Sequence, residues 1–185
     1  MLYAQLHLTL PPWIHDQVDS DAVYVTAESR VALAVQLSQL NVSRQSGGPF
    51  GAAIFNHAGR LLGIGVNRVV PHHCSVAHAE IMALAMTQQR LQKFRLNEGG
   101  ERITLATSAQ PCSMCYGALI WAGIDELLIA ARADDVQTLA GFDEGPLPAD
   151  WKGELEKRGI EVHTDMLREQ ACAVLKEYGE SGLVY

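Results

Sequence analysis

The sequence predicts an α/β fold in which helices cover both faces of a central sheet. Short apolar runs of strand type alternate along the chain with longer segments whose apolar residues recur at helical spacing. The central runs are largely apolar, as expected of strands that are covered on both faces. With 185 residues, 48% of them hydrophobic and 19% charged, the chain is long enough for one sizeable core. Because neither a repeat nor a low-complexity linker interrupts it, we expect residues 1–185 to form a single domain.

The first half of the chain predicts a helix, a hairpin and a second helix. Residues 27–44 place leucines on one helical stripe, and the sequence SGGPF ends this helix. The apolar segments 50–55 and 61–67 are joined by NHAGR, a turn whose Gly59 tolerates positive φ. They are therefore expected to form a strand hairpin. Residues 77–92 then resume helical spacing.

The second half continues the alternation of strands and helices. Gly123 is expected to end one helix and Gly179 the last helix of the chain, since glycine is common just past a helix C-terminus. The Gly- and Pro-rich stretch 141–153 is typical of a surface loop. The elements expected here are, in order, a strand at 102–108, a helix at 112–123, a strand at 126–131 and a helix at 166–179.

Charge and cysteine content narrow the classes of function. Fourteen Lys and Arg against 21 Asp and Glu leave a formal net charge of −7, so the basic footprint of a nucleic-acid-binding protein is missing. The sequence contains no apolar run as long as a membrane span and no basic residue before Arg30, where a secretory signal would carry one. Four cysteines without such a signal favour metal ligation over disulfides. We therefore expect a cytoplasmic protein that acts on a small molecule.

Two short motifs predict a metal site. The sequence PCSMC places Cys112 and Cys115 at the start of a predicted helix, where main-chain N–H groups help to hold thiolates deprotonated. The sequence HAE places His78 at the start of another predicted helix. These three side chains would supply three ligands of one tetrahedral Zn²⁺ per subunit and leave the fourth position open for a water or hydroxide nucleophile. Glu80 would lie beside that water.

Other interpretations of these residues are open. Cys112 and Cys115 alone could form a redox pair or half of a structural zinc knuckle. Cys74 could fill the fourth ligand position and close the site, which would make it purely structural. In such a site Glu80 would have no role beyond capping its helix. The paired histidines at 72–73 are expected to face solvent or to form local hydrogen bonds.

The pattern H-x-E followed by P-C-x-x-C is the signature of zinc-dependent nucleobase deaminases. It stands here as HAE at 78–80 and PCSMC at 111–115, so the sequence resembles the cytidine and deoxycytidylate deaminase superfamily. The resemblance implies a three-layer α/β/α cytidine deaminase-like fold with a mixed central sheet, and a homodimer. It also implies hydrolytic deamination. Glu80 would accept the proton of the zinc-bound water, pass it to a ring nitrogen and later protonate the departing ammonia.

Within that superfamily, GGPFGA and GFDEGP resemble bacterial guanine deaminases, including those that also accept ammeline. This resemblance implies that Glu144 is a second proton shuttle and that Phe50, Asn67 and Trp121 contact the substrate. A carboxylate at position 144 would complement the adjacent N1–H and 2-amine donors of guanine. In the same group the C-terminal tail crosses to the partner subunit, so Tyr185 would cover the partner's active site.

Each of these residues also has a purely structural interpretation. Glu144 could lie in an acidic surface turn, Phe50 and Trp121 could be core residues, and Asn67 could close the turn after its strand. Gln110 stands where many relatives have glutamate before Pro-Cys, a change that would alter hydrogen bonding or pocket charge but spare metal ligation.

The activity predicted from the sequence is zinc-dependent deamination of a purine base, guanine to xanthine plus ammonia, with ammeline as a further substrate. Guanosine, cytosine and tRNA wobble adenosine are rival substrates, and the last would require basic residues that a net charge of −7 does not supply. A rival of another class is a zinc-stabilised binding protein without turnover. That protein would have a closed four-ligand site and would be indifferent to replacement of Glu80.

Overall fold

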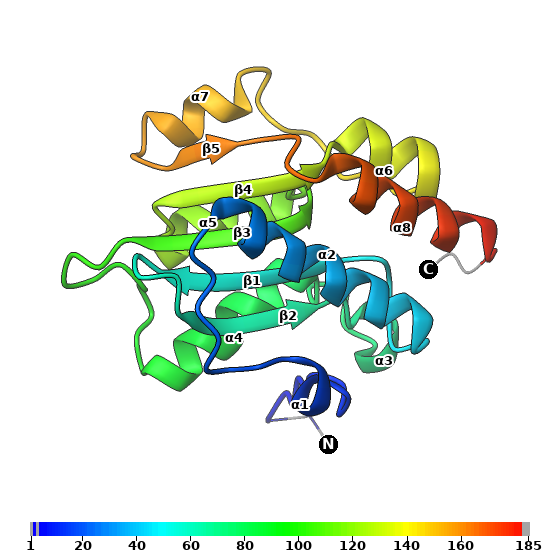
Figure 1. Ribbon diagram of the computed structural model, residues 1–185, viewed down its shortest axis with the longest axis horizontal. Helices are drawn as coiled ribbons and strands as arrows, with labels where there is room; N and C mark the ends of the chain where they lie inside the picture. Colours follow the sequence, from blue (N-terminus) through cyan, green and yellow to red (C-terminus); the bar gives the residue numbers. More distant parts are fainter. Residues whose placement is uncertain (1, 3, 183–185) are drawn as a thin grey trace.

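The computed structural model describes residue 2 and residues 4–182, and it has a mixed five-stranded sheet with helices on both faces (Figure 1). The strand order is β2-β1-β3-β4-β5. Strand β1 pairs antiparallel with β2 and β3, whereas β3, β4 and β5 run parallel. The strands are β1 (Gly51–Asn56), β2 (Leu61–Val66), β3 (Ile103–Ala109), β4 (Glu126–Ala131) and β5 (Glu161–His163). The predicted α/β class is confirmed.

Eight helices accompany these strands in the described part of the chain. None of them combines the length and the hydropathy that a membrane span requires. They are α1 (Ile14–Gln17), α2 (Ala27–Ser43), α3 (Val69–His72), α4 (Ala79–Leu91), α5 (Ser113–Ala122), α6 (Ala133–Ala140), α7 (Trp151–Glu156) and α8 (Arg168–Glu180).

Two apolar layers lie on opposite faces of the sheet. Alternate residues of a strand point to opposite faces, and β1 shows the consequence directly. Ala53 and Phe55 pack into the cluster formed with α2, α6 and α8, whereas Ala52 and Ile54 pack into the cluster formed with α4, α5 and α7. The sheet is thus the middle layer of three, which explains why β1, β3 and β4 are buried at nearly every position.

The predicted hairpin is confirmed at the β1–β2 connection. Gly59 has φ +75°, and its main-chain oxygen accepts a hydrogen bond from the N–H of Tyr24. A Cβ at this position would overlap the main chain of Tyr24, so glycine is required here on two grounds. Gly123 likewise ends α5 in the left-handed conformation, as predicted.

The prediction that Gly179 ends the last helix is wrong. Helix α8 continues to Glu180, and the φ angle of Gly179 is not positive, as it would be at a glycine that ends a helix. A Cβ at Gly179 would overlap the main-chain oxygen of Leu139, so this glycine allows α8 to approach α6 closely. The predicted loop 141–153 is also shorter than expected, because α7 begins at Trp151 with Asp150 as its cap.

An ion pair between α6 and α8 is expected to make stability depend on acidic pH. The guanidinium of Arg168 donates to both carboxylate oxygens of Asp135 at 2.7 Å, which lowers the pKa of Asp135 to about 2. A carboxylate with a lowered pKa stabilises the fold above its unfolded-state pKa of about 3.9, and this contribution is lost as pH falls towards 2. Asp135→Asn should therefore lower the free energy of unfolding at pH 7 by about 1–2 kcal/mol.

Urea unfolding at several pH values measures this effect. The difference between the wild type and Asp135→Asn should shrink between pH 4 and pH 2. Asp134→Asn, in the same helical turn but exposed, is the matched control and should leave stability nearly unchanged. A difference that does not vary with pH would exclude the ion pair as its source.

Candidate active site

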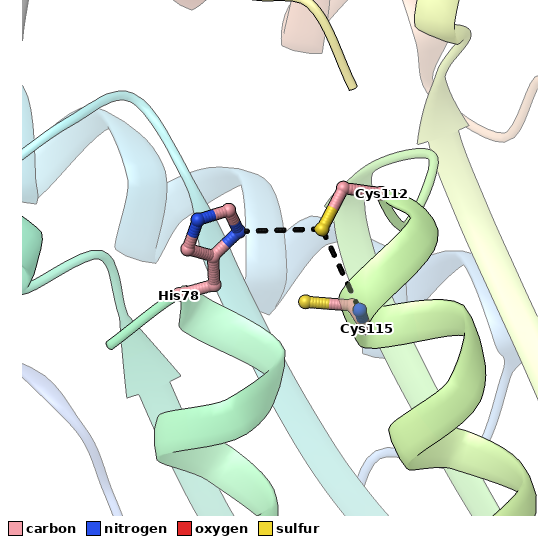
Figure 2. A group of neighbouring side chains, drawn as sticks. All are labelled: His78, Cys112 and Cys115. Carbon is pink, nitrogen blue, oxygen red and sulfur yellow. Dashed lines mark hydrogen bonds between the residues drawn. The ribbon is translucent and has the colours of Figure 1, made fainter. Parts of the chain in front are cut away.

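Two helix N-termini converge on one point, as Figure 2 shows. His78 is the N-cap of α4 and Cys112 is the N-cap of α5, and both have extended backbone conformations. Cys115 follows in the first turn of α5, where it is completely buried. The three side chains therefore reach the same point from two separate segments of the chain.

The geometry of these side chains fits a tetrahedral zinc ion. The Sγ atom of Cys112 lies 3.5 Å from Nδ1 of His78, and the ligand atoms of all three residues lie within 4.8 Å of one another. Zinc–sulfur bonds of about 2.3 Å and zinc–nitrogen bonds of about 2.0 Å place neighbouring ligands roughly 3.5 Å apart. Within the described residues this group includes no fourth histidine, cysteine or carboxylate, so Cys74 does not close it.

The surroundings of Cys112 favour its thiolate. Hydrogen bonding by the Cys115 thiol and by His78 lowers the pKa of Cys112 to about 4. The main-chain N–H of Cys115 also points at this sulfur, 3.5 Å away. Deprotonated sulfur is the form that binds a divalent cation. The hydrogen bond to Cys112, together with burial, raises the pKa of Cys115 in the same pair, so of the two sulfurs only that of Cys112 is favoured as a thiolate in the absence of a cation.

Glu80 lies in the first turn of α4 with its side chain buried beside the metal-binding group. Its Oε1 accepts a hydrogen bond from the hydroxyl of Thr107 at 3.0 Å, and its Oε2 accepts one from the thiol of Cys115 at 3.4 Å. Burial raises the pKa of Glu80. A carboxyl group held in this way has the fixed orientation that a proton carrier requires.

A cavity of about 400 Å³ opens next to the metal-binding group, within the size range typical of small-molecule sites. A smaller cavity shares four of its lining residues and adds Glu80 and Gln110. The residues that line the larger cavity are Phe50, Ser75, His78, Cys112, Ser113, Met114, Phe142, Asp143, Glu144 and Gly145.

Glu144 enters this cavity from the loop that follows α6. Burial, together with the negative charge of Glu80, raises the pKa of Glu144 to about 8. The main-chain oxygen of Glu144 accepts a hydrogen bond of 3.0 Å from the N–H of Ser113. Its backbone is therefore attached to the first residue of α5, next to Cys112 of the candidate metal site.

The structure brings some of the predicted substrate contacts together and separates others. Phe50 lines the cavity with Glu144. Asn67 is buried after β2, and its Oδ1 accepts a hydrogen bond from the N–H of Val69, as expected of a residue that closes a turn. Tyr185 lies outside the described residues.

The structure does not place Trp121 in this cavity. Its side chain is 81% exposed and lies in a separate groove between α4 and α5, so the core interpretation is also wrong. Helical geometry explains this position. Nine residues at about 100° each put Trp121 on the side of α5 opposite Cys112.

Sequence reasoning missed Phe142 and Thr107. Phe142 lines the cavity and packs edge-on against Phe50, with ring centroids 5.4 Å apart. The sequence did contain a signal for Phe142, because this residue stands two positions before Glu144 in the motif GFDEGP. For Thr107, its position near the C-terminal end of a buried strand, shortly before the PCSMC motif, could have indicated a role.

Comparisons with known proteins agree with this geometry. A solved structure of the guanine deaminase from Nitrosomonas europaea is 44% identical, with a TM-score of 0.91, and the match covers 97% of this chain and 99% of that chain. A structure of an Asn→Ala variant of the protein NE0047 with 8-azaguanine is 45% identical, with a TM-score of 0.90 over 96% of this chain and 98% of that chain. The guanine deaminase of Bacillus subtilis is 32% identical over 142 residues, which are 77% of this chain and 87% of the relative.

The family comparison covers the metal-binding segments themselves. The model of the cytidine and deoxycytidylate deaminase zinc-binding region matches residues 25–131, which include His78, Cys112 and Cys115. This match spans more than half of the chain and both helix starts that converge in the structure. The chain therefore belongs to the cytidine and deoxycytidylate deaminase family of zinc-dependent enzymes.

Proposed function

We propose that this protein is a guanine deaminase, which hydrolyses guanine to xanthine and ammonia. The observation that carries the proposal is the second carboxyl group, Glu144, which shares one cavity with the metal ligands His78 and Cys112. Guanine presents two adjacent donors, N1–H and the 2-amine, and a carboxylate complements both. The guanine deaminase relatives named above support the same substrate.

His78, Cys112 and Cys115 would hold the zinc ion. Bound zinc would supply a nucleophile at neutral pH by lowering the pKa of water to about 7. Glu80 would carry a proton from the attacking water to the ring nitrogen next to the carbon that carries the amine. The hydroxyl of Thr107 keeps the carboxyl group of Glu80 in a single orientation for both transfers.

Glu144 serves the leaving amine. With a pKa raised to about 8, its carboxyl group exists in both protonation states near neutral pH, as a residue that exchanges protons requires. After water adds to the ring carbon, Glu144 would carry the proton of the new hydroxyl group to the amine. The C–N bond then breaks, ammonia leaves and a carbonyl remains. Two carboxyl groups with different surroundings thus divide the proton transfers. Ammeline, which carries an amine beside a ring nitrogen, is proposed as a further substrate.

Ammonia release by the zinc-loaded protein tests the proposal. Guanine should react faster than guanosine, ammeline, cytosine and adenine when all are assayed at equal concentration. Faster turnover of cytosine or guanosine would contradict the assignment of guanine. Failure of every compound, with stoichiometric zinc present, would favour the zinc-stabilised binding protein.

We also propose that the protein is a cytoplasmic homodimer. Trp121 and Phe94 are 81% and 77% exposed and border a groove of about 280 Å³ between α4 and α5. Exposed apolar surface of this kind is typical of protein interfaces. Sedimentation should report twice the mass of one chain. The free thiols of the metal-binding group support a reducing compartment.

A further inference from the structure

The loop that carries Glu144 has one short-range hydrogen bond of its own, from the N–H of Gly145 to Oδ1 of Asp143 at 2.9 Å. It runs between Gly141 and Gly145, which have φ +78° and +73°. Glycine at such positions leaves the chain many alternatives in the absence of other contacts. One attachment is the hydrogen bond from the N–H of Ser113 to the main-chain oxygen of Glu144. A precise position for the carboxyl group requires further contacts.

Three aromatic rings supply a second attachment. Phe142 lies between Phe50 and Tyr178, with ring centroids 5.4 Å and 5.9 Å apart. Phe50 borders the cavity, whereas Tyr178 belongs to α8 and is only 5% exposed. The rings of Phe142 and Tyr178 are stacked, with 29° between their planes. This aromatic series connects the loop to the last helix.

The residue after Tyr178 supplies a third attachment. Gly179 lies against the main-chain oxygen of Leu139, in the last turn of α6, and a Cβ there would overlap that oxygen. Helix α6 ends at Ala140, directly before the loop. Helices α6 and α8 lie side by side (Figure 1). The end of α8 therefore contacts both the last turn of α6, directly before the loop, and the aromatic residue of the loop.

We propose that Tyr178 and Gly179 are positioning residues that set the location of the Glu144 carboxyl group. The inference rests on the proposed function, because that function assigns Glu144 a proton-transfer role. Tyr178 acts through the ring of Phe142, and Gly179 acts by allowing α8 to approach α6. Neither residue lines the cavity, so their effect is on the rate of the reaction and not on contacts with the substrate.

Kinetics of Tyr178→Leu test the inference. We expect kcat to fall by about 10-fold to 100-fold, because displacement of a reacting group by about 1 Å costs up to about 10² in rate, and KM to change less than about threefold. Tyr178→Phe keeps the ring and should retain kcat close to that of the wild type. Gly179→Ala should lower kcat in the same way through the overlap with Leu139.

A matched control separates positioning from general loss of stability. Tyr24→Leu removes a ring that packs on Phe55 with centroids 5.3 Å apart, in the same apolar layer but remote from the loop. It should lower the melting temperature and leave kcat unchanged. An equal loss of kcat in Tyr24→Leu and Tyr178→Leu would overturn the inference.

A double-variant cycle tests whether Tyr178 acts through Glu144. In a Glu144→Gln background, the added change Tyr178→Leu should lower kcat by less than about twofold, because the group that it positions has already been removed. A further loss as large as that in the wild-type background would place the action of Tyr178 elsewhere and overturn the proposal.

Hydrogen exchange provides a readout that does not depend on turnover. The N–H of Ser113 is the first in α5 and has no partner within that helix, so its protection reports the bond to the Glu144 oxygen. Tyr178→Leu should speed its exchange by at least about fivefold relative to Tyr24→Leu. Unchanged exchange of the Ser113 N–H in Tyr178→Leu would refute the inference. Because this measurement needs no turnover, it tests the inference separately from the ammonia-release assay that tests the proposed function.

Discussion

Replacement of Glu80 by glutamine is expected to lower kcat for guanine by at least about 10³-fold, while zinc content and the melting temperature stay close to those of the wild type. Glutamine has nearly the same shape and can still accept the hydrogen bond from Thr107, but it cannot take up a proton. Steady-state ammonia release, combined with metal analysis of the same preparation, measures both quantities.

A control is needed because Glu80 also stands in the first turn of a helix, where a carboxylate is favourable for purely structural reasons. Glu28 occupies the equivalent part of α2 and is exposed. Glu28→Gln should leave kcat unchanged. Turnover near the wild-type level in Glu80→Gln would remove Glu80 from the mechanism and would revive the interpretation of a structural zinc site.

Replacement of Cys115 by serine is expected to abolish stoichiometric zinc binding and, with it, activity. Cys115 is completely buried and its sulfur is one of three ligand atoms within 4.8 Å of one another. A serine hydroxyl is a poor substitute for a thiolate, and two remaining ligands bind zinc weakly. Metal content after dialysis and ammonia release should both fall to background.

Cys172→Ser is the matched control for this variant, since Cys172 lies on α8 and does not belong to the metal-binding group. It should keep one zinc per chain and full activity. Removal of zinc from the wild type with a chelator should likewise abolish activity, and added Zn²⁺ should restore it. Full activity in zinc-free protein would contradict the metal-dependent mechanism.

Much of the fold was accessible from local sequence patterns. The strand β4 and the helix α2 are confirmed almost to the residue, because uninterrupted apolar runs and leucine stripes reflect burial directly. The short helices α6 and α7 were not predicted. They are too short to show a repeated apolar pattern, and caps and ion pairs, such as the one between Asp135 and Arg168, help to stabilise them. Patterns of hydrophobicity carry no signal for such contacts.

The sequence by itself identified the three side chains that form the candidate zinc site. Ligation requires particular donor atoms at the start of a helix, and His78, Cys112 and Cys115 satisfy that requirement within two short motifs. The relation between those motifs and Glu144 was available only by resemblance, because no local spacing connects a loop after α6 with the start of α5.

Only the tertiary structure decided which other residues act at the site. It placed Phe142 in the cavity and Trp121 on the far side of α5, although both had aromatic side chains near a motif. It also showed that Gly179 continues a helix instead of ending it. The physical reason is the same in each case. Exposure, close approach and shared cavities depend on which elements pack together, and that packing is a property of the whole chain and not of any short segment.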